Sequence, residues 1–257
     1  MFTGTIPTVR KTILITGATS GLGEGMARAF AREGHDLALL ARRVDRLEEL
    51  RRELQAHDDI RVAVRRLDVE DAECVAPAFE EVEDELGGID RIICNAGVAA
   101  GGQLGQGHTA GNLAIARTNF VGSLAQIESA LTIFRRRNAG HLVLISSTAA
   151  VRPLPGNLAT YSASKIALAS LGRSLAMDYS ASPIKISTIF PGWIRTPLNA
   201  HMSKQLFEID QDTGVRALVS AIKSEKSRAF VRTWPWLPFS FLMQALPEAA
   251  FRRLAKD

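Results

Sequence analysis

Residues 12–23 have the sequence TILITGATSGLG, and the fold of the chain follows from them. The first five residues are apolar or β-branched, which predicts a buried strand over Thr12 to Thr16. A glycine-rich turn comes next, and apolar residues then recur at helical spacing through Met26 and Phe30. A strand, a glycine-rich turn and a helix can cradle a pyrophosphate, because glycine lets the backbone approach and the helix N-terminus offers free amides. The alternative is a tight connection without a ligand, since the spacing is Gly-x-x-x-Gly-x-Gly and not the commoner Gly-x-Gly-x-x-Gly.

The alternation of strand and helix continues along the rest of the chain. The predicted strands are residues 12–16, 36–40, 62–67, 90–94, 141–145, 184–190 and 228–232. After the helix that follows Gly23, the predicted helices are residues 44–55, 71–86, 112–134, 166–179 and 212–222. This order predicts an α/β fold, a Rossmann-type doubly wound parallel sheet of seven strands with helices on both faces. We find no repeat or linker, so residues 1–257 are expected to form one domain.

Composition excludes several classes of function. Of the 257 residues 46% are hydrophobic, which is enough for a large core, and the net charge is only +4. Arginine clusters such as Arg135-Arg136-Arg137 alternate with acidic runs and lack the interleaved aromatic residues of a nucleic-acid platform. Cys74 and Cys94 form no CxxC motif, which favours a reducing, cytoplasmic setting. Residues 1–10 lack the pattern of a signal peptide, and no metal site is predicted.

The C-terminal tract from Thr233 to Pro247 is apolar and uncharged, and it contains three prolines. It is too short and too interrupted to span a bilayer. Three roles remain open for its central part, Trp234 to Leu246. In order of preference, it packs on the domain or on a partner subunit, it walls a hydrophobic substrate pocket, or it contacts a membrane surface with the help of nearby basic residues. These basic residues are Arg252, Arg253 and Lys256.

Two arginines follow the second predicted strand. An NAD site would have an acidic residue about 20 positions after the glycines, to bind the ribose 2′-hydroxyl. This chain has Arg42 and Arg43 there, which suit a 2′-phosphate through charge-assisted hydrogen bonds. NADP(H) is therefore favoured over NAD(H), with Arg42 preferred to Arg43 as the ligand. The alternative is that both arginines begin the next helix in solvent.

Polar side chains follow other strands at the edge where α/β sheets bind ligands. Asp68 and Val69 follow the third strand, where the carboxylate could accept from an adenine amino group or cap the next helix. Asn95-Ala96-Gly97 follows the fourth strand, and Ser147 the fifth. The glycine-rich loop over residues 101–111 forms either a rim of the site or a plain surface loop, and its His108 is expected to be exposed.

Tyr161 and Lys165 are four residues apart, so a helix places them one turn apart on one face. A nearby ammonium favours the phenolate and lowers the tyrosine pKa, and a hydroxyl tuned in this way can exchange a proton with a carbonyl oxygen. Alone, the pair is equally typical of a solvated helix. Asn119 lies inside a predicted helix, where asparagine is unfavourable, so it marks a candidate for a special backbone position.

Together these motifs resemble the short-chain dehydrogenase/reductase family. The resemblance covers residues 11–196 and rests on motifs that occur in one order along the chain. They are Thr16-Gly17-x-x-x-Gly21-x-Gly23, Asn95-Ala96-Gly97, Asn119-x-x-Gly122, Ser147, Tyr161-x-x-x-Lys165 and Pro191-Gly192. The interval from Ser147 to Tyr161 is one residue longer than is usual in the family, which keeps Thr148 as an alternative to Ser147. The segment from about residue 198 to 257 would hold substrate specificity, and it names no substrate.

The resemblance implies a role for each site residue. Tyr161 would be the general acid or base, Ser147 would bind the substrate oxygen, and Lys165 would hold the ribose and lower the tyrosine pKa. Asn119 would hold a water in a proton relay. Cofactor contacts would come from Gly17, Ser20, Gly21, Leu22, Gly23, Arg42, Arg43, Asp68, Val69, Asn95, Ala96, Gly97, Tyr161, Lys165, Pro191, Gly192, Ile194 and Thr196.

The family also pairs subunits through the helices that contain Asn119 and Tyr161, so a homodimer or homotetramer is expected. Small residues in the second helix, including Ala169 and Gly172, suit such a contact or a contact within the chain. The leading hypothesis for function is an NADP(H)-dependent oxidoreductase that interconverts a carbonyl and an alcohol on a hydrophobic small-molecule substrate. The alternative is a dinucleotide-binding sensor or scaffold without turnover, and a weaker one is a membrane-peripheral reductase of lipid-like substrates.

Overall fold

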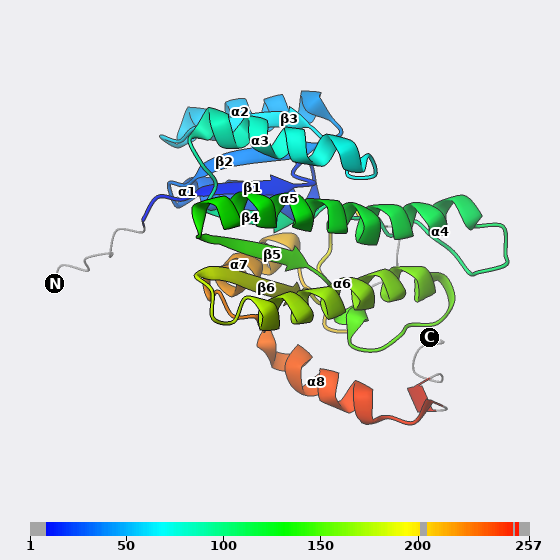
Figure 1. The fold of residues 1–257 in the computed structure, drawn as a ribbon. Helices are drawn as coiled ribbons and strands as arrows, with labels where there is room; N and C mark the ends of the chain where they lie inside the picture. The colour runs from blue at the N-terminus through cyan, green and yellow to red at the C-terminus, as the bar shows by residue number, and fades with distance from the viewer. Residues whose placement is uncertain (1–8, 201–204, 249, 252–257) are drawn as a thin grey trace.

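The computed structural model describes residues 9–200, 205–248 and 250–251. Its strands form one parallel sheet in the order β3-β2-β1-β4-β5-β6-β7 (Figure 1). The strands are β1 Thr12–Thr16, β2 Asp36–Ala41, β3 Val62–Arg66, β4 Arg91–Cys94, β5 Gly140–Ile145, β6 Ile184–Phe190 and β7 Arg228–Phe230. The predicted doubly wound sheet is confirmed, because continuous apolar runs mark strands that are buried on both faces.

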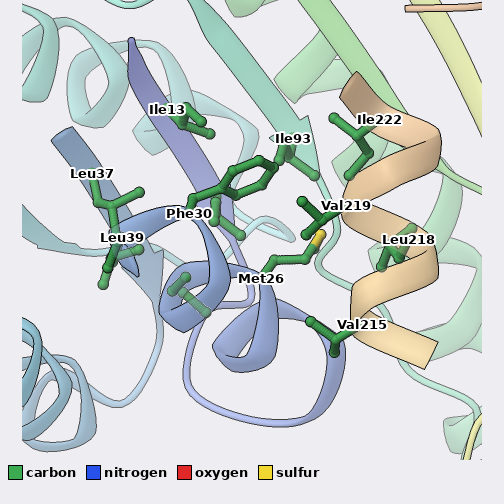
Figure 2. Packing of buried hydrophobic residues seen from close by; sticks show 14 of the residues in the cluster. Ile13, Met26, Phe30, Leu37, Leu39, Ile93, Val215, Leu218, Val219 and Ile222 are labelled. Atoms are coloured by element: carbon green, nitrogen blue, oxygen red, sulfur yellow. The ribbon is translucent and has the colours of Figure 1, made fainter. Parts of the chain in front are cut away.

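Helices cover both faces of the sheet, and strand side chains alternate between the two layers. Ile13 and Ile15 of β1 join a core with helices α1 (Gly21–Arg32), α2 (Val44–His57) and α7 (Gln211–Lys223), whereas Leu14 points to the other face. Figure 2 shows Met26 and Phe30 of α1 against side chains of α7 in the first core. The opposite face is covered by α3 (Val75–Leu86), α5 (Gly122–Arg137) and α6 (Ala159–Asp178).

Two predicted helices differ from the observed ones in an informative way. Residues 71–86 begin as a 3₁₀ turn, Ala72–Cys74, before α3. Residues 112–134 form α4 (Thr109–Ala116) and α5 joined by a π-helical turn, Arg117–Val121. Because a π turn is rare and displaces the residues within it, Asn119 does occupy a special backbone position, as its unfavourable placement suggested.

The C-terminal tract, for which no secondary structure was predicted, forms a helix, α8 (Thr233–Ala245). Its first turn departs from helical geometry at Trp234, and Pro238 lies inside it. Helix α8 lies beyond the β6–β7 edge of the sheet (Figure 1). Its Trp236 packs with Phe190 and Phe230, so the tract packs on the sheet. In the described part of the chain no helix has the length and apolarity needed to cross a membrane.

Candidate active site

A cavity of about 1100 Å³ lies at the carboxyl ends of the strands. The strand order reverses between β1 and β4, and a doubly wound sheet leaves its crevice at that point. Most of the predicted site residues line this cavity: Gly17, Ser20, Gly21, Leu22, Arg42, Arg43, Asp68, Val69, Asn95, Ala96, Gly97, Ser147, Tyr161, Lys165, Pro191, Gly192, Ile194 and Thr196. Gly23 and Asn119 are not among the lining residues and lie behind the wall.

Tyr161 and Lys165 lie in the first turns of α6, which begins at Ala159 and not at Ile166 as the apolar period predicted. Two hydrogen bonds join this helix to the end of β5. Lys165 Nζ donates to the Ile145 carbonyl at 2.9 Å, and Ser146 Oγ donates to the Lys165 carbonyl at 3.0 Å. The side chain of Lys165 is thereby fixed at the floor of the cavity, 5.8 Å from the centre of the Tyr161 ring.

Ser147 is the hydrogen-bond partner of the Tyr161 hydroxyl. It lies at the start of a 3₁₀ turn, Thr148–Ala150, where its Oγ also accepts from the Ala149 amide at 3.1 Å. Thr148, the alternative to Ser147, uses its backbone amide to bond the Pro191 carbonyl at 2.9 Å. The longer interval before Tyr161 is therefore accommodated without a change in the serine that meets the tyrosine.

The ionisation of this pair differs from the expected pattern. Burial raises the pKa of Tyr161 above its ordinary value, and the hydrogen bond from Ser147 offsets this only in part. Burial also lowers the pKa of Lys165 to about 8. The pKa of Tyr161 in this structure is therefore raised and not lowered, because desolvation by burial outweighs the hydrogen bond from Ser147.

Asn119 is fully buried and connects three segments behind the cavity. Its Oδ1 accepts from the Val98 amide at 2.8 Å, and its Nδ2 donates to the Val98 carbonyl and to Ser164 Oγ. A β-carbon on Gly97 would lie 3.2 Å from Asn119 Oδ1 and 3.6 Å from Lys165 Nζ. Asn119 therefore holds the backbone after β4 close to Lys165.

The glycine-rich loop between β1 and α1 has the geometry of an anion cradle. Gly17 and Gly21 have φ values of +66° and +55°, which favour glycine. Ser20 precedes α1 but makes no capping bond with its side chain, which leaves the first amides of the helix available to an anion. Gly23 serves packing, since a β-carbon there would lie 2.3 Å from the Gly17 carbonyl oxygen. These features fit the pyrophosphate of a dinucleotide.

Thr16 and Asn95 hold the loop in place, and the role of Thr16 as a buried junction was not predicted. Its Oγ1 donates to Gln126 at 2.8 Å and accepts from the amides of Asn95 and Ala96. Asn95 Nδ2 donates to the Thr16 carbonyl at 2.9 Å. A polar residue that ends a buried strand is the signal that could have identified this junction.

Arg42 and Arg43 lie at one end of the cavity with exposed side chains. Arg43 donates to the hydroxyl of Thr19 at 2.9 Å and to its carbonyl at 3.2 Å, so it leans over the glycine-rich loop. Arg42 Nη1 is 4.0 Å from an oxygen of Asp68, whose other oxygen accepts from the Glu70 amide. Both guanidinium groups thus supply positive charge at this end of the cavity.

The opposite wall is formed by the segment after β6 and by α8. Asn199 accepts from the Thr196 amide and donates to the Ile194 carbonyl, which fixes the backbone turn after Gly192. A β-carbon on Gly192 would lie 2.1 Å from Trp236 Nε1, so the indole rests directly on this glycine. The C-terminal tract therefore also walls the cavity, the second role considered for it.

The glycine-rich loop after β4 contributes little to the cavity. Of residues 101–111 only Gly101 lines it, and His108 is exposed, as expected. A β-carbon on Gly102 would lie 2.3 Å from the His108 ring. The loop is therefore mainly a surface loop that folds against its own histidine.

Comparisons with known proteins agree with this architecture. The family model described as short chain dehydrogenase matches residues 11–206. An uncharacterised oxidoreductase of Mycobacterium tuberculosis is 51% identical over 247 residues, which cover 96% of this chain and 98% of the relative. A short-chain dehydrogenase from Sphingobium yanoikuyae in complex with NADPH is 26% identical with a TM-score of 0.78, covering 93% of this chain and 97% of that one.

An alcohol dehydrogenase from the archaeon Thermococcus sibiricus, complexed with 5-hydroxy-NADP, is 27% identical with a TM-score of 0.75 and covers 83% of this chain and 91% of that one. Together the family match and these relatives support an oxidoreductase that acts on a CH–OH/C=O pair with a nicotinamide dinucleotide. The chain belongs to the short-chain dehydrogenase family.

Proposed function

We propose that the protein is an NADP(H)-dependent oxidoreductase that interconverts a carbonyl and an alcohol on a hydrophobic substrate. The observation that carries the proposal is the Tyr161 hydroxyl, which is hydrogen-bonded to Ser147 and one helical turn from Lys165. These three side chains line one cavity with the glycine-rich loop. In this proposal residues 1–257 act as one domain in which residues 198–257 select the substrate.

Ser147 and Tyr161 hold the substrate oxygen between two hydroxyl groups. Tyr161 donates its proton to that oxygen in reduction and takes one from the alcohol in oxidation. Lys165 is charged at neutral pH, because its pKa is about 8, and its field stabilises the phenolate left behind. When bound, the nicotinamide supplies or accepts the hydride at the carbonyl carbon. A water-mediated proton path beyond Lys165 through Asn119 remains part of the proposal.

The chain would hold the dinucleotide through the predicted contacts. The loop residues Gly17, Ser20, Gly21 and Leu22 would bind the phosphates, with Gly23 supporting them from behind. Residues 68–69 and 95–97 would meet the adenosine, and residues 191–196 the carboxamide. The proposed preference for NADP(H) rests on Arg42 and Arg43. It is supported by two similar structures, the Sphingobium yanoikuyae enzyme in complex with NADPH and the Thermococcus sibiricus enzyme in complex with 5-hydroxy-NADP.

The test is NADPH consumption by the purified protein against a carbonyl panel. The panel contains a ketosteroid, a 3-oxoacyl thioester, a quinone, an aromatic ketone and a ketosugar, with NADH and Tyr161→Phe run alongside. Turnover that prefers NADPH and disappears in Tyr161→Phe supports the proposal. Full-rate turnover in Tyr161→Phe rejects the mechanism. Tight NADPH binding with no turnover on any carbonyl favours the sensor or scaffold alternative.

The cofactor preference has its own test at the two arginines. Arg42→Ala and Arg43→Ala should each raise the KM for NADPH, with little change for NADH, because only NADPH carries the 2′-phosphate. Arg42 was preferred from the sequence. The bond from Arg43 to Thr19, beside the glycine-rich loop, supports Arg43 as an equal candidate. Equal effects on the two cofactors would contradict the preference.

We also propose that the protein self-associates in a cytoplasmic setting. Exposed Val121 at the end of the π-helical turn, Leu124 on α5 and Met177 on α6 support pairing through these helices. Gly172 and Ala169 serve contacts within the chain: a β-carbon on Gly172 would lie 2.2 Å from Thr188 Oγ1, and Ala169 packs near Trp236. Light scattering on Leu124→Glu tests the pairing. Both cysteines are free, which suits a reducing compartment.

Contact of α8 with a membrane surface is supported by the exposed side chains of Trp234, Phe241 and Leu242. Sedimentation with anionic vesicles measures it directly. Trp234→Ser with Phe241→Ser should release the protein from the vesicles, and no difference from the wild type would count against the contact.

A further inference from the structure

The cavity has a second half that lies beyond Tyr161 and is predominantly apolar. Residues that line it include Leu154, Trp193, Trp236, Phe239, Met243 and Leu246. Lys165 lies beside Tyr161, and three more charged residues, Arg42, Arg43 and Asp68, line the far end of the cavity. Among the described residues that line the apolar half, Arg152 is the only charged one.

Arg152 belongs to the loop that joins Ser147 to Tyr161, and this loop is fixed to α6. Ser162 Oγ donates to the Ala149 carbonyl at 2.9 Å and accepts from the Leu154 amide at 3.1 Å. Ser162 follows Tyr161 directly in the chain. The position of Arg152 is therefore tied to the helical turn that presents the candidate proton donor.

Two contacts hold the guanidinium against the C-terminal part of the chain. Nη1 donates to the carbonyls of Met243 and Leu246 at 2.5 and 2.6 Å. The ring of Phe251 covers one face, with its centre 4.3 Å from the guanidinium carbon. These contacts use the two N–H groups of Nη1 and leave the three on Nε and Nη2.

Neither Nε nor Nη2 of Arg152 bonds a residue within 9–200, 205–248 or 250–251, and no carboxylate in these ranges forms an ion pair with it. An arginine is always charged, and a partly buried charge without a counter-ion is costly. The Nε–Nη2 edge of a guanidinium also matches a carboxylate in a two-pronged geometry. Arg152 therefore offers a positive charge and three N–H donors to an anionic ligand in an otherwise apolar pocket.

We propose that Arg152 is a specificity-determining residue that binds the carboxylate of an otherwise apolar substrate. The substrate class is then a bulky or long-chain oxo acid, or the corresponding hydroxy acid. The carboxylate meets Arg152 while the hydrocarbon part packs against the α8 wall. This inference rests on the proposed function, because the same cavity would present the carbonyl to Tyr161.

The first test measures binding without turnover, in the Tyr161→Phe background. The fluorescence of Trp193 and Trp236, which line the cavity, reports titrations with decanoate and with decan-1-ol. The parent protein should bind decanoate about tenfold or more tightly than decan-1-ol, as a charge-assisted pair would provide. Arg152→Gln should abolish that preference and leave the affinity for decan-1-ol unchanged.

Three further variants test whether Arg152 binds the carboxylate of the ligand or only anchors α8. Arg152→Lys keeps the charge but not the fork, and should retain only part of the preference for decanoate. Phe251→Leu removes the ring that covers the guanidinium and should leave the preference in place. Arg173→Gln, exposed on α6, should match the parent. Equal weakening of both ligands by Arg152→Gln, or no preference in the parent, would overturn the inference and make Arg152 only an anchor for α8.

The second test uses turnover in the otherwise wild-type protein. An oxo acid and its methyl ester are compared with NADPH, and Arg152→Gln should reduce kcat/KM about tenfold or more for the acid alone. Decanoate binding that depends on Arg152 without turnover of any carbonyl would reject the proposed function but keep the carboxylate site. Turnover that favours the ester over the acid would reject the site but keep the function.

Discussion

Two buried polar clusters lie at opposite ends of the same sheet, and they differ in how their charges are compensated. At the amino end Arg91 Nη2 and Lys11 Nζ both donate to Glu225, and Arg91 Nε donates to His141 Nδ1 at 2.8 Å. At the carboxyl end Lys165 Nζ donates to the Ile145 carbonyl and pairs with no carboxylate of the described residues, and Tyr161 faces the cavity.

Perturbed ionisation alone does not distinguish the two clusters. Burial and the charge of Arg91 lower the pKa of His141 to about 3, a strong shift far from the cavity. Because arginine can only donate, His141 accepts through Nδ1 and carries its proton on Nε2, toward Ser187 at 2.8 Å. The amino-end cluster is satisfied within the protein, whereas the carboxyl-end cluster has polar groups directed at a cavity, which is the pattern of a functional site.

The largest expected effect is on catalysis at the carboxyl end. Tyr161→Phe should reduce kcat by about 10²- to 10⁴-fold, since it removes the proposed general acid. The melting temperature should change little, because the substitution keeps the ring and removes only the hydrogen bond between the hydroxyl and Ser147. Steady-state kinetics and thermal unfolding of one preparation measure both. A large loss of stability with unchanged kcat would mean that Tyr161 supports the fold and does not take part in catalysis.

The second effect reverses this pattern at the amino end. Arg91→Met should lower the free energy of unfolding by about 3 kcal/mol, because it leaves Glu225 and His141 without their buried partner. Arg91 is only 2% exposed and His141 only 3%, so water does not readily replace the bond between these two side chains. Urea unfolding gives the change, and kcat per folded molecule should equal that of the wild type. A loss of turnover at constant stability would break the comparison between the two ends.

The third effect is opposite in sign. Lys165→Met should raise the free energy of unfolding by about 1 to 2 kcal/mol at pH 7, because burial disfavours the ammonium and a thioether has no such cost. Turnover should be lost at the same time. Urea unfolding of Lys165→Met gives the change in the free energy of unfolding. Lys165→Arg, which keeps a charge, is the control. Destabilisation by the methionine would mean that Lys165 supports the fold as Arg91 does.

The two ends also differ in how far the sequence predicts them. Buried strands are continuous apolar runs, so all seven were located to within two residues of their observed ends. Their carboxyl ends then had to meet, which brought Ser147, Tyr161 and Asn95 into one cavity. The amino-end cluster was not predicted, because Glu225 joins Arg91 and Lys11 only through the three-dimensional arrangement of loops.

Local patterns failed where tertiary packing determines the structure. Helix α8 forms despite its prolines, because Trp236 packs onto Gly192 and the β6–β7 edge. From the sequence Gly172 suits either a subunit contact or a contact within the chain, and the structure uses it to bring α6 against Thr188. The raised pKa of Tyr161 depends on burial, which the spacing to Lys165 does not reveal. Arg152 was not singled out, since its setting depends on carbonyls more than ninety residues away.

The last effect is a gradual pH dependence at the amino end. In the unfolded chain His141 takes up a proton near pH 6.5, whereas in the folded protein it does so only near pH 3. Between these values the unfolded state binds more protons, so stability falls as pH falls, by about 1.4 kcal/mol per pH unit for this group. His141→Gln should remove one proton from that slope in urea unfolding from pH 7 to pH 4, while the exposed His57→Gln should not. An unchanged slope in His141→Gln would show that the amino-end cluster opens to water. Pairing of charges within the protein would then not distinguish this cluster from the one at the cavity.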